Sequence, residues 1–205
     1  MANLETPYLL LALPQMDDPN FARAVVLITR HQKNEGAEGI ILNIALVDEV
    51  EGPAQMRAEI RDLSGNKVSE FDEDLFDGGP VDDEAVRVVH DVSEAGDLES
   101  HIGQGIYYSS DPGSFQKILE FPESQGRRRF FLGRAAWSKG QLEGEMRGGA
   151  WFPAPLKKEI VLFRPGAEDK SDWRDEIWRK ALELNGLDPL TLMSPGDGSG
   201  TSSLN

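Results

Sequence analysis

The sequence predicts an α+β fold, a single domain with a largely antiparallel or mixed β-sheet and helices packed around it. Strand-like segments rich in β-branched residues outnumber the helical segments and occur in clusters. Regular alternation of strand and helix, which a doubly wound parallel sheet needs, is absent from the sequence. We therefore predict one domain over residues 1–193, followed by a disordered tail rich in glycine and serine over residues 194–205.

The first half of the chain is predicted to hold strands and one short helix. The apolar run at residues 8–13 (YLLLAL) is typical of a buried strand. Two β-branched runs at residues 24–29 and 39–44 flank a polar loop, which predicts a hairpin. Residues 53–63 have apolar side chains four and three positions apart, the spacing of a short amphipathic helix. Residues 71–81 (FDEDLFDGGPV) are interpreted as an acidic lead into a glycine-rich turn.

The second half contains further strands and the clearest helix. Strands are predicted at residues 85–89, 105–109, 129–132 and 159–163. Helices are predicted from Asp111-Pro112 to Phe121, over residues 140–146, and over residues 171–184. The last is the clearest, because its apolar residues recur on one side and Gly186 follows as a stop.

The composition excludes several kinds of site. The chain has no cysteine, so it can form no disulfide, thiolate nucleophile or cysteine zinc site. Its N-terminus lacks a basic leader, and its first apolar run is too short for a signal sequence or a membrane span. These features predict a cytoplasmic protein with no membrane association.

The charge is strongly acidic and unevenly distributed. The net charge of −15 argues against direct binding to nucleic acid or to anionic membranes. Residues 48–99 contain 17 acidic and 4 basic residues, whereas residues 127–164 contain 9 basic and 3 acidic ones. If the protein does bind nucleic acid, residues 127–164 are the candidate surface.

The residue types that usually carry catalysis or metal binding form no motif. The histidines have no spacing typical of metal ligands; His31 and His90 each end an apolar strand, where a hydrogen-bonded role is favoured over a metal site. A loose cation site made by Asp74, Asp77 and Asp82 stays open, although a solvated acidic loop is the default. We predict no catalytic residue, no metal and no cofactor.

Five stretches resemble one protein family. They are LLLALPQMDDPNFARAVVLITRH, GAEGIILN, FDGGPV, FLGRAAWSKGQLEGEM and WRKALELNGLDP, and the match runs from about residue 8 to residue 188, nearly the whole chain. In this order they resemble the YqgE/AlgH family of uncharacterised bacterial proteins. The resemblance implies a branched β-sheet that is partly closed into a barrel and surrounded by helices. It supplies no catalytic residues; one branch of the family carries the label of transcriptional regulator, without a DNA-binding motif.

The glycine-rich turn and the most distinctive motif define a candidate binding site. Glycines allow a ligand to approach the backbone, and Arg134 can supply a cation. The candidate ligand-binding residues are Gly78, Gly79, Pro80, Arg134, Trp137, Gln141, Glu143 and Glu145. A structural role is favoured, in which Trp137 anchors the turn and Gln141 satisfies buried polar groups.

Two classes of function stay open at this point. The first is a non-enzymatic regulatory or interaction protein whose partner is another protein. The second is an enzyme or sensor that binds a small anionic ligand in a cleft between the Gly78-Gly79-Pro80 turn and residues 137–145. A deep cleft with apolar walls and convergent polar groups favours the second class.

Overall fold

The computed structural model describes residues 5–46, 57, 58, 60, 62, 74–122, 125–166 and 169–193. The strands within these residues are β1 (Tyr8–Ala12), β2 (Val25–Gln32), β3 (Gly36–Ile41), β4 (Leu75–His90), β5 (His101–Gly103), β6 (Ile106–Ser109), β7 (Arg128–Trp137) and β8 (Trp151–Pro155). The helices are α2 (Pro112–Leu119), α3 (Gln141–Arg147), α4 (Lys158–Val161), α5 (Trp173–Leu184) and α6 (Pro189–Met193), with a short 3-10 helix, η2 (Lys170–Asp172), before α5.

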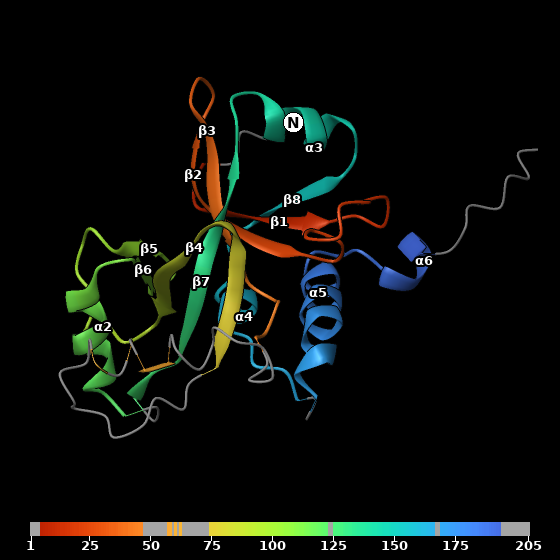
Figure 1. The fold of residues 1–205 in the computed structure, drawn as a ribbon. Coiled ribbons are helices and arrows are strands. Elements are labelled where there is room, and N and C mark those ends of the chain that lie inside the picture. The colour runs from red at the N-terminus through yellow and green to blue at the C-terminus, as the bar shows by residue number, and fades with distance from the viewer. Residues whose placement is uncertain are drawn as a thin grey trace, which may run out of the picture.

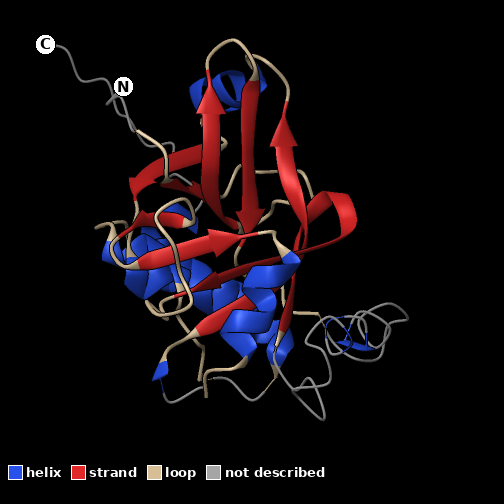
Figure 2. Ribbon diagram, turned by 90° about the vertical axis from the view of Figure 1, so that its left-hand side faces the viewer, coloured by secondary structure: helices blue, strands red, loops and turns tan. Residues whose placement is uncertain are grey.

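The described strands form one antiparallel sheet in the order β5-β6-β4-β7-β3-β2-β1-β8. The sheet curls into a half-barrel, with α4 and α5 on one side, α3 beside the β2–β3 hairpin and α2 beside β5 and β6 (Figures 1 and 2). The predicted α+β fold of a single domain is thereby confirmed. No helix in the described part of the chain has both the length and the apolar character to cross a bilayer.

Strand β4 folds back on itself around β7. Residues 75–81 lie opposite residues 130–134, and residues 86–90 then lie opposite residues 128–132. One stretch of β7 therefore contacts both halves of β4. The predicted glycine-rich turn belongs to this strand: residues 75–81 are extended, and residues 71–73 lie outside the described residues.

Three glycines allow the backbones to meet where β4 changes register against β7. A Cβ on Gly79 would lie 2.4 Å from the carbonyl carbon of Arg134, and a Cβ on Gly133 would lie 2.2 Å from the carbonyl oxygen of Gly79. A Cβ on Gly78 would also lie 2.5 Å from the oxygen of Gly133. Gly79 and Gly133 have φ angles of +134° and +71°, which side chains disfavour. The GGP motif is therefore required by the fold.

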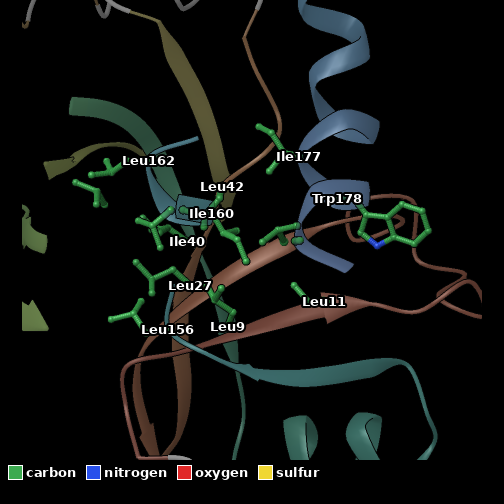
Figure 3. Close-up of a cluster of buried hydrophobic side chains, with 14 of the residues drawn as sticks. Leu9, Leu11, Leu27, Ile40, Leu42, Leu156, Ile160, Leu162, Ile177 and Trp178 are labelled. Atoms are coloured by element: carbon green, nitrogen blue, oxygen red, sulfur yellow. The ribbon is translucent and has the colours of Figure 1, made fainter. Parts of the chain in front are cut away.

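The sheet is buried on both faces. Leu9 and Leu11 point into a core shared with α4 and α5, part of which is drawn in Figure 3. Tyr8 and Leu10 point into a second core, which α3 covers through Leu142. A third core lies between β4, β7 and α2. Alternate residues of one strand thus enter different cores, which explains why β1 is apolar throughout.

Most predicted elements are present, and one is wrong. The predicted strands at residues 8–13, 24–29, 39–44, 85–89, 105–109 and 129–132 correspond to β1, β2, β3, β4, β6 and β7. Residues 159–163 were predicted as a strand, but residues 158–161 form α4. Ile160, Val161 and Leu162 all enter the same core. An extended strand would send alternate residues to opposite faces, so only a helical turn fits.

Three parts of the chain complete the comparison. The predicted helices α2, α3 and α5 are confirmed. Strand β8 is not predicted; Pro153 and Pro155 are tolerated in it because it lies at the edge of the sheet. Residues 57, 58, 60 and 62 of the predicted helix at 53–63 are helical, and its other residues lie outside the described ones. The predicted tail at 194–205 also lies outside them.

The contact between the glycines of β4 and β7 generates the first prediction. Gly133→Ala should lower the free energy of unfolding by more than about 2 kcal/mol, because its Cβ meets backbone atoms and its φ is positive. Gly144→Ala is the matched control, since a Cβ there meets nothing within 4 Å in α3. It should stabilise the protein by up to about 1 kcal/mol. Urea unfolding checks both, and equal effects would contradict this role of Gly133.

Candidate functional site

The carboxylate of Glu145 fastens α3 to the sheet. Its Oε2 accepts hydrogen bonds from the indole N–H groups of Trp137, at 3.0 Å, and Trp151, at 2.8 Å. Its Oε1 accepts a third from the amide of Gln141, at 3.0 Å. Both tryptophans are buried, at the end of β7 and the start of β8. These three predicted site residues of the distinctive motif are therefore joined in one network that satisfies buried donors.

Glu143 points to a different partner. Its Oε1 lies 3.3 Å from Nε2 of His31, whose Nδ1 lies 2.8 Å from the hydroxyl of Tyr8. Burial, with a contribution from the charge of Glu143, raises the pKa of Tyr8 to about 12. The hydrogen-bonded role predicted for His31 at a strand end is confirmed.

Arg134 lies on the face of β7 opposite Trp137. Arg134 and Trp137 are three positions apart, and Trp137 points into the core beneath α3. The Nε of Arg134 donates to Asp82 at 2.7 Å, and its Nη1 lies 3.5 Å from Glu38. The bond to Asp82 raises the pKa of Arg134 and lowers that of Asp82. Pro80 lies beside Arg134 in the register. The predicted site residues thus form separate groups, and ligand binding by them stays a prediction.

The aspartates of the acidic stretch also have separate partners. Asp74 lies 2.7 Å from Lys170 and 3.4 Å from Arg164. Asp77 accepts a hydrogen bond from the backbone N–H of Gly79, two positions on. Asp82, the third aspartate, is bound to arginine as described above. Across the described ranges, no group of three or more histidine, aspartate or glutamate side chains is placed to hold a metal ion.

A cavity of about 160 Å³ lies at a different place, where β4 and β7 meet the segments around α4 and α5. Its lining combines aromatic and aliphatic side chains with several arginines. The lining residues are Asp74, Phe76, Gly126, Arg127, Arg128, Arg129, Leu162, Phe163, Arg164 and Trp173. Residues at both ends of the basic segment 127–164 therefore meet at this cavity.

Arg129 is the most unusual of the lining residues. It is 7% exposed, and its Nη1 donates to the carbonyl of Val161 at 3.1 Å while its Nη2 donates to that of Leu42. Its guanidinium carbon lies 3.9 Å from the ring centroid of Phe76 and 5.5 Å from that of Phe131. Arg129 therefore makes two cation–π contacts and two hydrogen bonds to neutral acceptors.

The charge of Arg129 has no ion-pair partner among the described residues. Burial lowers its pKa to about 9, against a smaller opposing effect of Asp74. The guanidinium still carries its charge at neutral pH, since this value lies above 7. A buried cation of this kind is destabilising unless an anion meets it.

The other arginines of the cavity differ in direction and pairing. Arg127 donates to Asp91, and Arg164 pairs with Asp74 while its side chain is 72% exposed. Arg128 points the other way along β7 and donates to carbonyls at the end of α2. Among the lining arginines, Arg129 is buried, whereas the side chains of Arg127 and Arg164 are 54% and 72% exposed. The exposed side of the cavity, at Arg127 and Arg164, is called its mouth below.

Sequence reasoning did not select Arg129. Its acceptors belong to segments far away in the chain, so no local spacing marks them. One signal was available: in RRRFFL, Arg129 lies two positions before Phe131, on the same side of the strand, and is followed by three apolar residues. A cation at an inward-facing strand position is rare enough to single out.

His90 is a second buried ionisable residue, at the end of β4 next to Arg128 in the register. It is 1% exposed, and its ring stacks on that of Tyr107, with centroids 5.2 Å apart. Burial lowers the pKa of His90 to about 4, so the imidazole is neutral at pH 7. It lies at the end of β4 with a hydrogen bond to the backbone of Val92, as predicted, while its Nδ1 has no partner among the described residues.

Comparison with known proteins gives a family and related sequences. A profile described as AlgH-like matches residues 9–190 of the chain. A UPF0301 protein of Xanthomonas campestris pv. campestris (strain B100) is 35% identical over 190 residues, covering 90% of this chain and 95% of its own. A UPF0301 protein of Chlorobaculum tepidum is 31% identical over 179 residues, covering 87% and 85%. The resemblance to the YqgE/AlgH family is thereby confirmed.

Two solved structures share the fold. The solution structure of the AlgH protein from Pseudomonas aeruginosa aligns with a TM-score of 0.62 at 24% identity, over 96% of this chain and 99% of that one. The crystal structure of protein DIP2367 from Corynebacterium diphtheriae gives 0.61 at 22% identity, over 94% and 92%. These similarities establish a shared architecture.

The Glu145 network generates the second prediction. Glu145→Gln should lower the free energy of unfolding by about 2 kcal/mol, because an amide cannot accept all three hydrogen bonds. In a Trp137→Phe background the loss should be smaller, since one donor is already absent. Glu143→Gln is the matched control on α3; its contact with His31 is partly exposed, so the loss should stay below about 1 kcal/mol. Equal losses would contradict the network.

His90 generates the third prediction. Its folded-state pKa of about 4 lies below the usual value of 6.5, so the unfolded chain binds the proton first as pH falls. The resulting stability is present above about pH 6.5 and is lost as pH falls towards about 4. His90→Phe should remove about 3 kcal/mol of this pH dependence. Urea unfolding from pH 7 to pH 4 measures it; unchanged pH dependence in the variant would contradict the assignment.

Proposed function

The chain belongs to the AlgH-like family, and we propose that this member is a non-enzymatic regulatory protein that binds a small organic anion in the cavity at Arg129. The observation that carries the proposal is the buried guanidinium of Arg129, which lines a cavity and pairs with no described carboxylate. A ligand anion in the cavity would supply the missing charge. The site resembles the second class of function expected from the sequence, but at a different place in the fold.

The hydrogen-bonding capacity of Arg129 supports a ligand. A guanidinium has five N–H groups in a planar fork, which matches a carboxylate or a phosphate. The described hydrogen bonds to Val161 and Leu42 use two of them. Donors are thus available in addition to those that hold the side chain in place.

The size and walls of the cavity define the organic part of the ligand. A cavity of about 150 Å³ lined by apolar residues holds a benzene molecule, and this one is of similar volume, about 160 Å³. Phe76, Leu162, Phe163 and Trp173 supply apolar surface. The ligand therefore carries an anionic group on an apolar body about the size of one ring.

The lining supports binding over catalysis. Among its described residues the ionisable groups are arginines and Asp74, and Asp74 is held in two ion pairs. Such a set can fix an anion, and it provides no pair of groups with the geometry of nucleophile and base. Binding without turnover is what a sensor requires.

The net charge suggests how the binding would be read out. At −15, the surface repels nucleic acid, which supports a protein as the downstream partner. The regulatory signal would then be the ligand-dependent stability or shape of the region around α4 and α5.

The fourth prediction tests the cavity. Phenyl phosphate or benzoate should raise the melting temperature of the wild-type protein in a saturable way. At a ligand concentration one hundred times the dissociation constant, the free energy of unfolding should rise by about 2.7 kcal/mol. Arg129→Met should abolish the shift. Arg134→Met is the matched control, because Arg134 pairs with Asp82 and Glu38 and does not line the cavity.

If Arg129→Met does not fold, the binding site can still be located on the wild-type protein. Backbone NMR with either probe should then show the largest shift changes at Arg129, Phe76 and Leu162. No saturable binding of either probe, or changes centred on Arg134 and the α3 face, would overturn the proposal.

A further inference from the structure

The charges around the cavity define the anionic group more narrowly than Arg129 does alone. Arg127 shares Asp91 with Lys158, and Arg164 shares Asp74 with Lys170. With Arg129, the described cations at the cavity and in these two ion-pair groups are Arg127, Arg129, Lys158, Arg164 and Lys170, against the carboxylates Asp74 and Asp91. The described groups thus carry three more positive than negative charges, with Arg128 left aside.

Asp74 is the carboxylate within the protein that pairs with Lys170 and Arg164. Its side chain is 19% exposed and lies 2.7 Å from Lys170, whereas its distance to Arg164 is 3.4 Å, longer than a normal hydrogen bond. It also lines the cavity and acts on Arg129 through its charge. Asp74 therefore holds Lys170 closely and leaves Arg164, which is largely exposed, able to turn towards a ligand.

The two common anionic groups fit this arrangement differently. A carboxylate carries one charge and two oxygens, which one guanidinium fork can satisfy. A phosphomonoester carries a charge of about −1.5 to −2 at pH 7 and three acceptor oxygens. It has enough oxygens to bind Arg129 and an arginine at the mouth together, and its charge neutralises more of the excess positive charge.

We infer that the ligand class is a phosphomonoester with a ring-sized apolar or aromatic body, bound with its phosphate between Arg129 and Arg164. The inference rests on the proposed function and narrows it. The phosphate would compete with Asp74 for Arg164, so that binding loosens the ion pair between Asp74 and Arg164. The apolar body would occupy the space between Phe76, Phe163 and Trp173.

The fifth prediction compares three probes by isothermal titration calorimetry: phenyl phosphate, benzoate and inorganic phosphate. Phenyl phosphate should bind at least about tenfold more tightly than benzoate, through the added charge-assisted hydrogen bonds. It should also bind about tenfold more tightly than inorganic phosphate, because its ring is buried in the cavity.

The pH dependence separates the two anions. The second pKa of a phosphomonoester is about 6, so its affinity should fall from about pH 7.5 to about pH 5.5, whereas benzoate keeps its charge over this range. The charged residues that line the cavity are Asp74, Arg127, Arg128, Arg129 and Arg164. The other members of their ion-pair groups are Asp91, Lys158 and Lys170, and His90 lies nearby on β4. Arg129 with a pKa of about 9, Asp91 with a lowered pKa, and His90 at about 4 do not titrate within that range.

Two substitutions at the mouth have opposite expected effects. Arg164→Gln should lower the affinity for phenyl phosphate about tenfold, because the phosphate reaches this side chain. The affinity for benzoate, whose carboxylate does not reach it, should stay within about twofold. Asp74→Asn should raise the affinity for phenyl phosphate severalfold, because it removes the carboxylate that competes for Arg164. Arg164 is 72% exposed, so its replacement should not unfold the protein. Arg147→Gln, on α3, is the matched control and should change neither affinity.

The possible results distinguish this inference from the proposed function. Equal, Arg129-dependent affinities for phenyl phosphate and benzoate would overturn the phosphomonoester class and leave the anion site in place. Inorganic phosphate binding as tightly as phenyl phosphate would overturn the ring-sized body. Binding that Arg164→Gln does not weaken would overturn the placement of the phosphate. No binding of any probe would overturn both proposals.

Discussion

The close backbone contact between Gly79 and Gly133 is the constraint on which the rest of the structure depends. It lets residues 75–81 and 86–90 of β4 lie against one stretch of β7, which side chains at these glycines would prevent. The same register sets Phe76 opposite Phe131. Because Arg129 is two residues before Phe131 on β7, its guanidinium comes to lie over the ring of Phe76. The position of the cavity therefore follows from a contact between the backbones of β4 and β7 at residues without side chains.

Local sequence patterns were sufficient for most elements of this fold but not for their pairing. Alternation and β-branched residues marked β1, β2, β3 and β7, and the apolar side of α5 was clear. A short apolar run such as residues 159–163 is ambiguous, and only its position in the core decides that it is helical. The resemblance to a family supplied the branched sheet, which periodicity alone cannot give.

The candidate site was predictable only in part, for a similar reason. Trp137, Gln141 and Glu145 lie within nine residues of one another, and their shared structural role could be foreseen from residue types. Arg129 depends on partners from β4, from the end of β3 and from α4, up to 87 positions away. Nothing in a linear pattern connects an arginine to carbonyl groups at that distance, so this site needed the fold.

Two buried or half-buried charges of this protein, Glu145 and Arg129, are held by neutral groups, and the comparison between them separates structure from function. Glu145 accepts three hydrogen bonds from neighbours on three elements, and the two buried indole donors among them would otherwise be left unsatisfied. Its charge serves the protein itself. Arg129 gives two of its donors to carbonyls and lines a cavity, without a described carboxylate to match its charge. An apolar side chain would avoid the desolvation of a cation there. A buried charge that pairs with no carboxylate of the described residues, beside a cavity, is the arrangement that an anionic ligand would complete.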